Sequence, residues 1–331
     1  MPEKPAEHHA CCAPSREPTT TSSIPQGPPT PPSTDAGTHA IEQCLIPGQT
    51  FAMGDHQRDG RREDGESPVH PVAVSAFSID ATSVTNADWA TFTDATGYRS
   101  EAETFGFSAV FHLALAADPD DIVGRPPATP WWLGVKGADW SHPQGRHSNV
   151  EDRMDHPVTH VSWNDAIAYC AWAQRRLPTE AEWECAARGG QFGLRYPWGQ
   201  EELVDGQWAC NIWQGSFPGQ NTLEDGWLTT APVRTYQPNG YGLWQTVGNV
   251  WEWCSDWAHP AYYAFCAAGG VATDPQGPDA GGQKSMRGGS FLCHPSYCNR
   301  YRNAARSANT PDSSMANTGF RTVALDQPAL A

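Results

Sequence analysis

The stretch from Arg287 to Arg321, RGGSFLCHPSYCNRYRNAARSANTPDSSMANTGFR, carries the features that decide the fold and the chemistry of this chain. It holds two cysteines, Cys293 and Cys298, five positions apart with Pro295 between them. On a helix this spacing would turn the two thiols about 140° apart, and on a straight strand they would point to opposite faces. Because Pro295 favours a turn, we expect both sulfurs to reach one side.

A close pair of thiols suits a redox disulfide, part of a zinc site, or a two-thiolate site for a soft cation such as Cu(I). Zinc needs two further ligands, and no CxxC or HxxxH pattern supplies them convincingly. His156 and His160 have the HxxxH spacing, but they lie in PVTHVSW, which reads as extended. Two strand or loop histidines are therefore the better interpretation, and the spacing alone leaves the use of the thiol pair open.

Acidic and amide oxygens gather in two other places, Asn211–Ile212 with Glu224–Gly226, and Gly248–Glu252. Hard oxygen ligands followed by glycine turns suit Ca²⁺. The same residues also suit ordinary turns, in which Asn and Asp bond their own backbone. The tryptophans in the segment TVGNVWEWCSDW alternate as on a strand packed on both faces, so we expect most of them in the core.

The composition excludes several classes of function. The 331 residues include 21 Lys and Arg against 37 Asp and Glu, a formal net charge of −16, which argues against nucleic acid or an anionic membrane as partner. No run approaches the ~20 apolar residues that a membrane span needs, and the first residues lack the apolar core of a secretory signal. With 31 Gly, 29 Pro and 15 Trp, we expect a loop-rich α+β fold with large flat side chains in its core.

The chain divides into a Pro-rich tail, residues 1–40, expected to be disordered, and one domain over residues 41–326. Local patterns predict three helices, capped or begun by Thr85, Trp163 and Thr179. The expected elements are helices over 85–96, 163–175 and 179–189, with Ala87, Ala90 and Phe92 inward in the first and Ala166, Ile167, Cys170 and Ala173 in the second, and strands over 72–77 and 157–162.

Taken together, these segments resemble the formylglycine-generating enzymes, the sulfatase-modifying factors, over nearly all of residues 41–325. The segments that carry the resemblance are PGQTFAMGD (47–55), HPVTHVSWNDAIAYCAW (156–172), RLPTEAEWE (176–184), YPWG (196–199), CNIWQGSFP (210–218), NTLEDGW (221–227), GLWQTVGNVWEWCSDW (242–257) and the block 287–321. The first of these mark a wider superfamily. The last is the specific one, because its GGSFLCHPSYC matches the part that holds the two catalytic cysteines of the family.

The resemblance implies a compact single domain related to C-type lectins and low in regular secondary structure. It implies an oxidase that converts the cysteine of a Cys-x-Pro-x-Arg motif in unfolded sulfatases to Cα-formylglycine, with O₂ and a thiol reductant. Cys293 and Cys298 would bind Cu(I) as thiolates. Four further positions match the active site of the family: Ser290 and Asn317 for polar contacts, and Trp251 and Tyr297 for the pocket wall.

The resemblance also implies two Ca²⁺ sites. Their ligands would be Asn211, Ile212, Asp225 and Trp227 for one ion, and Gln245, Gly248, Val250 and Glu252 for a second, less secure site in which Gln245 departs from the usual Asn. We expect the carboxylates of Asp225 and Glu252 to converge and to repel each other without a cation. Both calcium assignments rest on the resemblance, since turn chemistry alone also accounts for these residues.

The cysteines depart from the human-type members of the family. Two bridges known there would join the positions of Cys170 with Thr322 and of Ala187 with Asn303, so neither can form here. With no signal sequence, this indicates a bacterial, cytoplasmic enzyme. The sequence leaves open whether Cys254 and Cys266 pair.

Two other classes of function compete. An ergothioneine-type iron sulfoxide synthase shares the domain but carries an HxxxHxE iron motif on an additional helical domain, and here the glutamate after His160 is missing. A lectin-like binding module without catalysis would have no need of the Cys293 and Cys298 pair. Both are therefore weaker than the oxidase.

The tail contains a motif of its own. Cys12-Ala-Pro-Ser-Arg16 reproduces the Cys-x-Pro-x-Arg pattern within the enzyme. The match is open to four interpretations: chance in a Pro-rich segment, self-conversion, weak autoinhibition, or copper gathered together with His8, His9 and Cys11.

Overall fold

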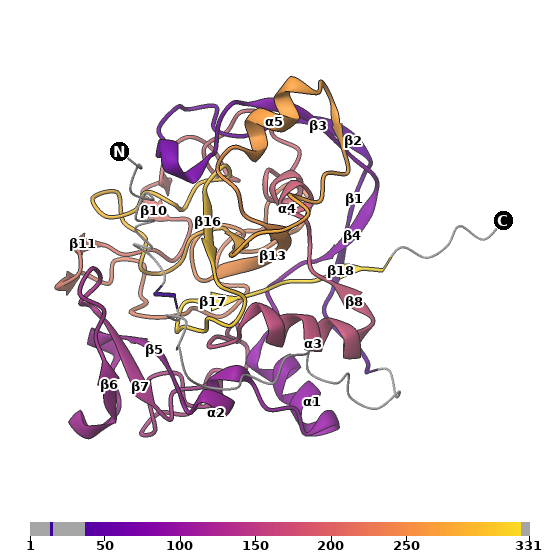
Figure 1. Ribbon diagram of the computed structural model, residues 1–331. Helices are drawn as coiled ribbons and strands as arrows, with labels where there is room; N and C mark the ends of the chain where they lie inside the picture. The colour runs from indigo at the N-terminus through magenta and orange to yellow at the C-terminus, as the bar shows by residue number, and fades with distance from the viewer. Residues whose placement is uncertain (1–13, 16–36, 326–331) are drawn as a thin grey trace, which may run out of the picture.

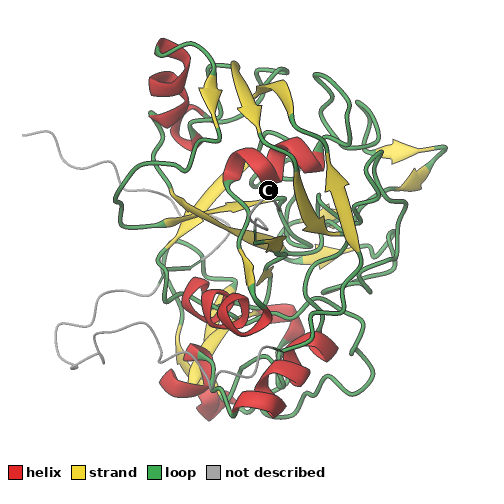
Figure 2. Ribbon diagram, turned by 90° about the vertical axis from the view of Figure 1, so that its right-hand side faces the viewer, coloured by secondary structure: helices red, strands yellow, loops and turns green. Residues whose placement is uncertain are grey.

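The computed structural model describes residues 14–15 and 37–325, and every structural statement below concerns those residues. The predicted tail, residues 1–40, lies outside the described residues apart from 14–15 and 37–40. Within the described parts, helices and strands are short and are joined by long irregular segments, as Figure 2 shows by colour. This is the loop-rich α+β architecture that the composition predicts.

The described chain contacts the domain before residue 41. The Gly37 N–H donates to the Trp172 carbonyl at 3.0 Å. The His39 ring lies 2.7 Å from the carboxylate of Asp80. These contacts hold residues 37–39 against the domain.

Five α-helices are described, and α1, α2 and α3 gather at one end of the molecule (Figure 1). The helices are α1 (Asn86–Thr96), α2 (Glu101–Phe105), α3 (Trp163–Ala173), α4 (Glu180–Ala187) and α5 (Tyr262–Ala268). The three predicted helices are thus present as α1, α3 and α4. Helices α2 and α5 were not predicted, because five and seven residues are too short for a periodic pattern. No helix in the described parts has the length and apolar character needed to cross a membrane.

Capping explains where the predicted helices begin. Thr85 and Thr179 each accept a hydrogen bond from the third helical residue, whose carboxylate bonds back to the cap. Helix α1 ends at Gly97, which has the left-handed φ of 67°. Its predicted core face is partly wrong, because Ala87 is exposed while Trp89, with no exposed surface, packs inward beside Phe92. In α3, Ile167 is only partly buried.

The strands form four small sheets and two hairpins. The orders are β16-β15-β13-β17, β1-β4-β18-β8, β14-β3-β2, β5-β7-β6, β10-β9 and β11-β12. Their bounds are β1 Gln43–Ile46, β2 Gln49–Met53, β3 His70–Val74, β4 Phe77–Asp80, β5 Phe107–Phe111, β6 Ile122–Gly124, β7 Trp132–Lys136, β8 Arg175–Arg176, β9 Leu203–Val204, β10 Gln207–Trp208, β11 Gly215–Ser216, β12 Gln220–Asn221, β13 Trp251–Trp257, β14 Ala272–Thr273, β15 Lys284–Arg287, β16 Arg306–Asn309, β17 Thr318–Gly319 and β18 Val323–Ala324.

Both predicted strands need correction. The stretch 72–77 spans the end of β3 and the start of β4, because the chain leaves one sheet at Ser75, whose N–H donates to Asp274 at 2.6 Å. The stretch 157–162 makes only an isolated bridge between Pro157 and Thr85. His160 there has a φ of 59°, a left-handed conformation that a regular strand does not contain.

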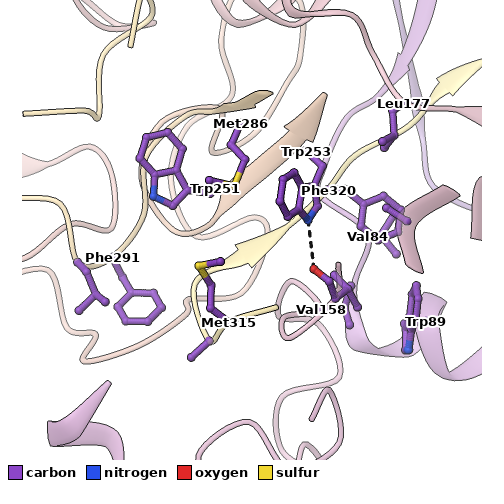
Figure 3. Close-up of a cluster of buried hydrophobic side chains, with 14 of the residues drawn as sticks. Val84, Trp89, Val158, Leu177, Trp251, Trp253, Met286, Phe291, Met315 and Phe320 are labelled. Atoms are coloured by element: carbon purple, nitrogen blue, oxygen red, sulfur yellow. Dashed lines mark hydrogen bonds between the residues drawn. The ribbon is translucent and has the colours of Figure 1, made fainter. Parts of the chain in front are cut away.

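The core is built largely from aromatic side chains around β13, as expected. Trp251 and Trp253 of this strand are both fully buried. The Trp253 indole donates to the Val161 carbonyl at 3.1 Å, the dashed line in Figure 3. Met286 lies near these tryptophans in the same view. The central sheet is therefore packed on both faces and offers a rigid frame at its ends.

Candidate active site

The predicted active-site residues meet at one end of the sheet β16-β15-β13-β17. Trp251 begins β13 and pairs in parallel with Thr318 of β17. Its N–H donates to the carbonyl of Asn317 at 2.8 Å. Strand β15 runs antiparallel to β13 and stops at this same end of the sheet, from which the chain continues to Ser290. Three segments far apart in the sequence thus converge there.

Gly289 makes the turn after β15 possible. Its φ is 77°, and a Cβ atom on it would lie 2.5 Å from the carbonyl oxygen of Arg300. No L-residue with a side chain fits that approach. The turn therefore sets Ser290 directly beside the segment that follows Cys298.

The segment from Cys293 to Cys298 folds as a turn, as Pro295 predicts. The Cys298 N–H donates to the His294 carbonyl at 3.0 Å, and the Cys293 N–H donates to the Ser290 carbonyl at 2.9 Å. Both cysteines are 1 % exposed and belong to one buried cluster with Trp251. The Cys293 sulfur accepts a hydrogen bond from the Ser290 N–H at 3.4 Å.

Ser290 and Asn317 make the polar contact expected of them. The Asn317 amide donates to the Ser290 hydroxyl oxygen at 2.9 Å. Ser290 and Asn317 are both fully buried. A continuous chain of contacts therefore runs from Trp251 through Asn317 and Ser290 to the sulfur of Cys293.

An aromatic wall lies beside Cys298, and sequence reasoning found only one of its members. Tyr297 stacks on Phe217 with ring centroids 4.1 Å apart, and Trp131 meets Tyr297 edge-on at 5.1 Å. Tyr297 and Trp131 are only partly buried. The indole N–H of Trp131 is buried and has no acceptor within the described residues. This wall can pack an apolar ring of a guest and still offer a donor to it.

Buried ion pairs fix both ends of the cysteine loop. Before it, Arg287 donates to Glu184 at 2.5 Å and is fully buried. After it, Arg300 makes two bonds of 2.7 Å to Asp64. Further pairs follow along the chain, Arg302 with Glu66 and Arg306 with Glu180. Buried ion pairs therefore hold the chain in place on both sides of the loop that carries the cysteines.

Asn249 is a central residue that the sequence prediction missed. Its φ is 60°, and its side-chain oxygen accepts from Asn211 at 3.1 Å and from the Ala231 N–H at 2.9 Å. Its carbonyl accepts from the Phe291 N–H at 2.9 Å. Asn249 therefore joins both candidate calcium segments to the cysteine loop. The Gly-Asn dipeptide, typical of left-handed backbone, was its signal in the sequence.

The first candidate calcium set has donors of the right kind. The side-chain oxygen of Asn211 is buried and has no donor among the described residues. The Asp225 carboxylate accepts N–H bonds from Ile212 at 3.2 Å and Trp227 at 3.0 Å, so the four residues lie together. The Ile212 carbonyl faces the side-chain amide of Gln214. Amide, carbonyl and carboxylate oxygens are what Ca²⁺ takes, so this set fits the ion.

The second set fits less well, because Glu252 is already committed. Its carboxylate accepts from Ser83 at 2.8 Å, from Trp183 at 2.7 Å, and from Arg321 at 2.7 and 2.8 Å. The expected repulsion between Asp225 and Glu252 is therefore wrong, since Arg321 balances the Glu252 charge. The Gln245 side-chain oxygen, by contrast, is buried without a donor in the described chain. The remaining members of the set are Gly248 and Val250.

His156 and His160 lie in the loop before α3 and hold structure together. His160 has no exposed surface, and its ring nitrogens lie 2.8 Å from the Ser108 hydroxyl and from the Pro143 carbonyl. His156 bonds Thr230 at 3.0 Å. Both histidines are therefore loop residues, as interpreted from the sequence, because they lie outside the helices and strands and bond to neighbouring segments.

Burial makes His160 a source of acid sensitivity. Desolvation lowers its pKa from 6.5 to about 4, so the folded protein keeps it neutral while the unfolded chain binds a proton below pH 6.5. Its contribution to stability is full above about pH 6.5 and is lost as the pH falls toward 4, a difference of about 3 kcal/mol. We expect His160→Gln to lose less unfolding free energy than the wild type between pH 7 and 4.5 in urea titrations. Equal losses in both proteins would refute this assignment.

The other described cysteines are buried thiols. Cys170, Cys185, Cys210, Cys254 and Cys266 are free, as is Cys44, so Cys254 and Cys266 do not pair. Desolvation raises the pKa of Cys170 and of Cys254, which makes both poor nucleophiles at neutral pH. They act as core residues.

Comparisons with known proteins agree with the geometry. The family model described as "Sulfatase-modifying factor enzyme 1-like domain" matches residues 29–325. The formylglycine-generating enzyme of Streptomyces coelicolor is 58% identical over 279 residues, which cover 84% of this chain and 88% of that protein. A bovine protein named inactive C-alpha-formylglycine-generating enzyme 2 is 42% identical over 85% of this chain and 87% of its own length.

Among solved structures, PvdO from Pseudomonas aeruginosa has a TM-score of 0.62 at 23% identity. The match covers 86% of this chain and 94% of the PvdO chain. At this identity the likeness concerns the fold alone. It confirms the expected fold, a single compact domain of mixed helices and strands.

Proposed function

This chain belongs to the formylglycine-generating enzyme family, and from that premise we propose that it oxidises the cysteine of a Cys-x-Pro-x-Arg segment in unfolded sulfatases to Cα-formylglycine. In the overall change the substrate cysteine loses its sulfur as H₂S and gains a carbonyl oxygen from O₂. Two thiols supply two electrons and two protons by joining as a disulfide, and the second oxygen leaves as water. The proposal is thus balanced in atoms and electrons.

The observation that carries the proposal is the contact chain Trp251–Asn317–Ser290–Cys293 with Cys298 in the same buried cluster. Family membership alone would not suffice, since a relative at 42% identity is named inactive. A buried pair of cysteines on a loop that buried ion pairs hold at both ends is more than a ligand-binding module needs. It supports catalysis rather than ligand binding by a lectin-like module.

Cys293 and Cys298 are the residues that would hold Cu(I), since soft thiolates select that ion and two of them leave room for a third sulfur. When bound, copper(I) supplies the redox centre that O₂ chemistry requires. The Ser290 N–H, 3.4 Å from the Cys293 sulfur, favours the thiolate. Asn317 fixes Ser290, and the buried position excludes bulk water.

The substrate would lie along the aromatic wall. Tyr297 directly precedes Cys298, Trp131 meets the Tyr297 ring, and both are partly accessible, so the proline of the motif can pack on their rings. The net charge of −16 favours a segment that carries arginine. The substrate must lie extended along these rings, and an unfolded segment can do so because its backbone is free to adopt that conformation.

The direct test is mass spectrometry of a Cys-x-Pro-x-Arg peptide incubated with the enzyme, Cu(I), thiol and air. We expect the cysteine to become an aldehyde, with loss of sulfur. A matched peptide with Ala in place of Arg should show a KM raised much more than kcat is lowered. An unchanged cysteine under all these conditions would overturn the proposal.

We propose further that Ca²⁺ stabilises the segment that carries Asn211 and Asp225. Desolvation raises the pKa of Asp225, and a bound cation would offset this cost of ionisation. A chelator should therefore lower Tm at neutral pH, and Asn211→Ala or Asp225→Ala should remove most of that response. Glu252→Gln is not an equivalent test, because it also breaks the bonds to Arg321.

A melting temperature that excess Ca²⁺ does not change after thorough chelation would contradict the first calcium site.

For the cellular location we propose the bacterial cytoplasm, supported by the free thiols of Cys170, Cys254 and Cys266.

A further inference from the structure

The loop between β2 and β3, residues 54–69, lies against the segment that carries Cys298. Besides the ion pairs that follow the cysteines, it makes two contacts closer to them. The Arg61 guanidinium donates to the Tyr297 carbonyl at 2.6 Å, and the Asn299 amide donates to the Asp59 carbonyl at 3.3 Å. The β2–β3 loop therefore holds the residue before Cys298 and the residue after it.

The Tyr297 carbonyl is the group through which Arg61 reaches Cys298. It belongs to the peptide unit that ends in the Cys298 N–H, and that N–H donates to the His294 carbonyl at 3.0 Å. Both polar groups of this one planar unit are thus bonded, the carbonyl to a charged donor. The two bonds fix the orientation of the unit and so restrict the direction in which the Cys298 side chain leaves the backbone.

The ring of Tyr297 is held by different contacts from its carbonyl. It stacks on Phe217 with centroids 4.1 Å apart and meets Trp131 edge-on at 5.1 Å. Loss of the bond from Arg61 would therefore loosen the backbone at Cys298 while the aromatic wall keeps its packing. We expect such a loss to affect the chemistry at the thiol pair more than the binding of a peptide along the wall.

Asp55 gives the β2–β3 loop the shape that presents Arg61. Its buried carboxylate accepts hydrogen bonds from the N–H groups of Gln57 at 3.0 Å, Arg58 at 2.9 Å and Gly60 at 2.8 Å. Gly60 directly precedes Arg61. Three backbone bonds to one carboxylate fix the course of the chain up to that arginine.

Resting on the function proposed above, we propose that Arg61 is a positioning residue for Cys298 and that Asp55 acts through Arg61. The arginine works through the peptide unit between Tyr297 and Cys298 and not by contact with the reacting atoms. Removal of a partner that orients a metal-binding side chain commonly lowers metal affinity or activity by about 10–100-fold. Arg62, the next residue, is exposed and has the same charge, which makes it the matched control.

The first test compares the steady-state kinetics of variants on a Cys-x-Pro-x-Arg peptide. Arg61→Met should lower kcat by about tenfold or more and change KM by less than about twofold. Phe217→Leu, which weakens the aromatic wall, should instead raise KM more than it lowers kcat. Arg61→Lys still offers a charged donor and should recover most of kcat, and Arg62→Met should leave both constants unchanged.

The second test needs no turnover and uses the protein without copper. Amide hydrogen exchange of the Cys298 N–H should be faster by about fivefold or more in Arg61→Met than in the wild type, because one of the two bonds that hold its peptide unit is gone. The same amide should exchange at the wild-type rate in Arg62→Met. This measurement detects the positioning of Cys298 independently of the reaction.

The role of Asp55 is tested by a double-mutant cycle. Asp55→Asn keeps one acceptor oxygen, so it should lower kcat less than Arg61→Met does. Added to Arg61→Met it should cause little further loss, since both substitutions act on the same contact. Additive losses in kcat would show that Asp55 does not act through Arg61.

The remaining outcomes separate this proposal from the proposed function. If Arg62→Met lowers kcat as much as Arg61→Met, loss of charge rather than loss of the contact is the cause and the positioning role is wrong. If Arg61→Met exchanges the Cys298 amide at the wild-type rate, the positioning role is wrong and the enzyme function stands. If the exchange rates change as expected while the wild type converts no peptide, the contact is supported and the proposed function falls.

Discussion

Cys298→Ser should abolish conversion of the substrate cysteine while leaving the fold intact, with kcat/KM lower by at least about a thousandfold. Serine replaces a soft sulfur with a hard oxygen, so the pair loses one of the two ligands that Cu(I) prefers. The hydroxyl still fits, because Cys298 is buried in the same turn by a backbone hydrogen bond that does not involve its side chain. Cys293→Ser should have the same effect.

Two measurements beside the activity assay distinguish a loss of chemistry from a loss of folding in these variants. Cu(I) titration should show tight binding in the wild type and none in either variant, and the melting temperature should change little. The matched control is Cys266→Ser, a buried free thiol in α5 away from the site, which should keep activity and copper binding. Either active-site variant that converts peptide at the wild-type rate would remove the pair from the mechanism.

Local signals predicted the parts of the fold that depend on neighbours in sequence. The capping boxes at Thr85 and Thr179 placed α1 and α4, and Pro295 predicted the turn between the cysteines. The sheets could not be predicted in the same way. The pairing of Trp251 with Thr318 joins residues 67 positions apart, and nothing within either short strand specifies its partner.

The candidate site was predicted at the residues that carry chemistry and missed at those that position them. Cys293 and Cys298 are recognisable as a pair, whereas Asn249 looks like an ordinary turn residue until its bonds to Asn211 and Phe291 are seen. Charged residues posed the same difficulty. Arg287 and the other buried arginines look like surface charges in a sequence, because an arginine is buried only when a partner from elsewhere in the chain pairs with it.

Arg287→Met should cost the protein about 3–5 kcal/mol of unfolding free energy, because it removes one of the two arginines that each of the buried carboxylates Glu180 and Glu184 contacts. Arg287 has no exposed surface and donates to Glu184 at 2.5 Å, to Glu180 at 3.3 Å and to the Asn303 carbonyl at 2.8 Å. Methionine fills much of the volume but provides no charge. Urea unfolding measures the loss, and the exposed pair of Arg234 and Glu42 provides the control.

Arg234→Met should change stability by less than about 1 kcal/mol, since solvent screens that surface pair.

The pH dependence of stability also distinguishes the buried ion pairs from the surface pair. Burial alone would raise the pKa of Glu180, but Arg306 and Arg287 outweigh it and hold the pKa at about 2. In the wild type the stabilisation from Glu180 is present above pH 4.5 and is lost as the pH falls toward 2.

Without Arg287 the buried carboxylates bind a proton more readily, so the deficit of Arg287→Met should be largest at neutral pH and should shrink toward pH 4. If the deficit were independent of pH, lost packing rather than a weakened charge balance would be the cause. Because Arg287 directly precedes the turn to Ser290, the same variant should also lower kcat at temperatures where it remains folded.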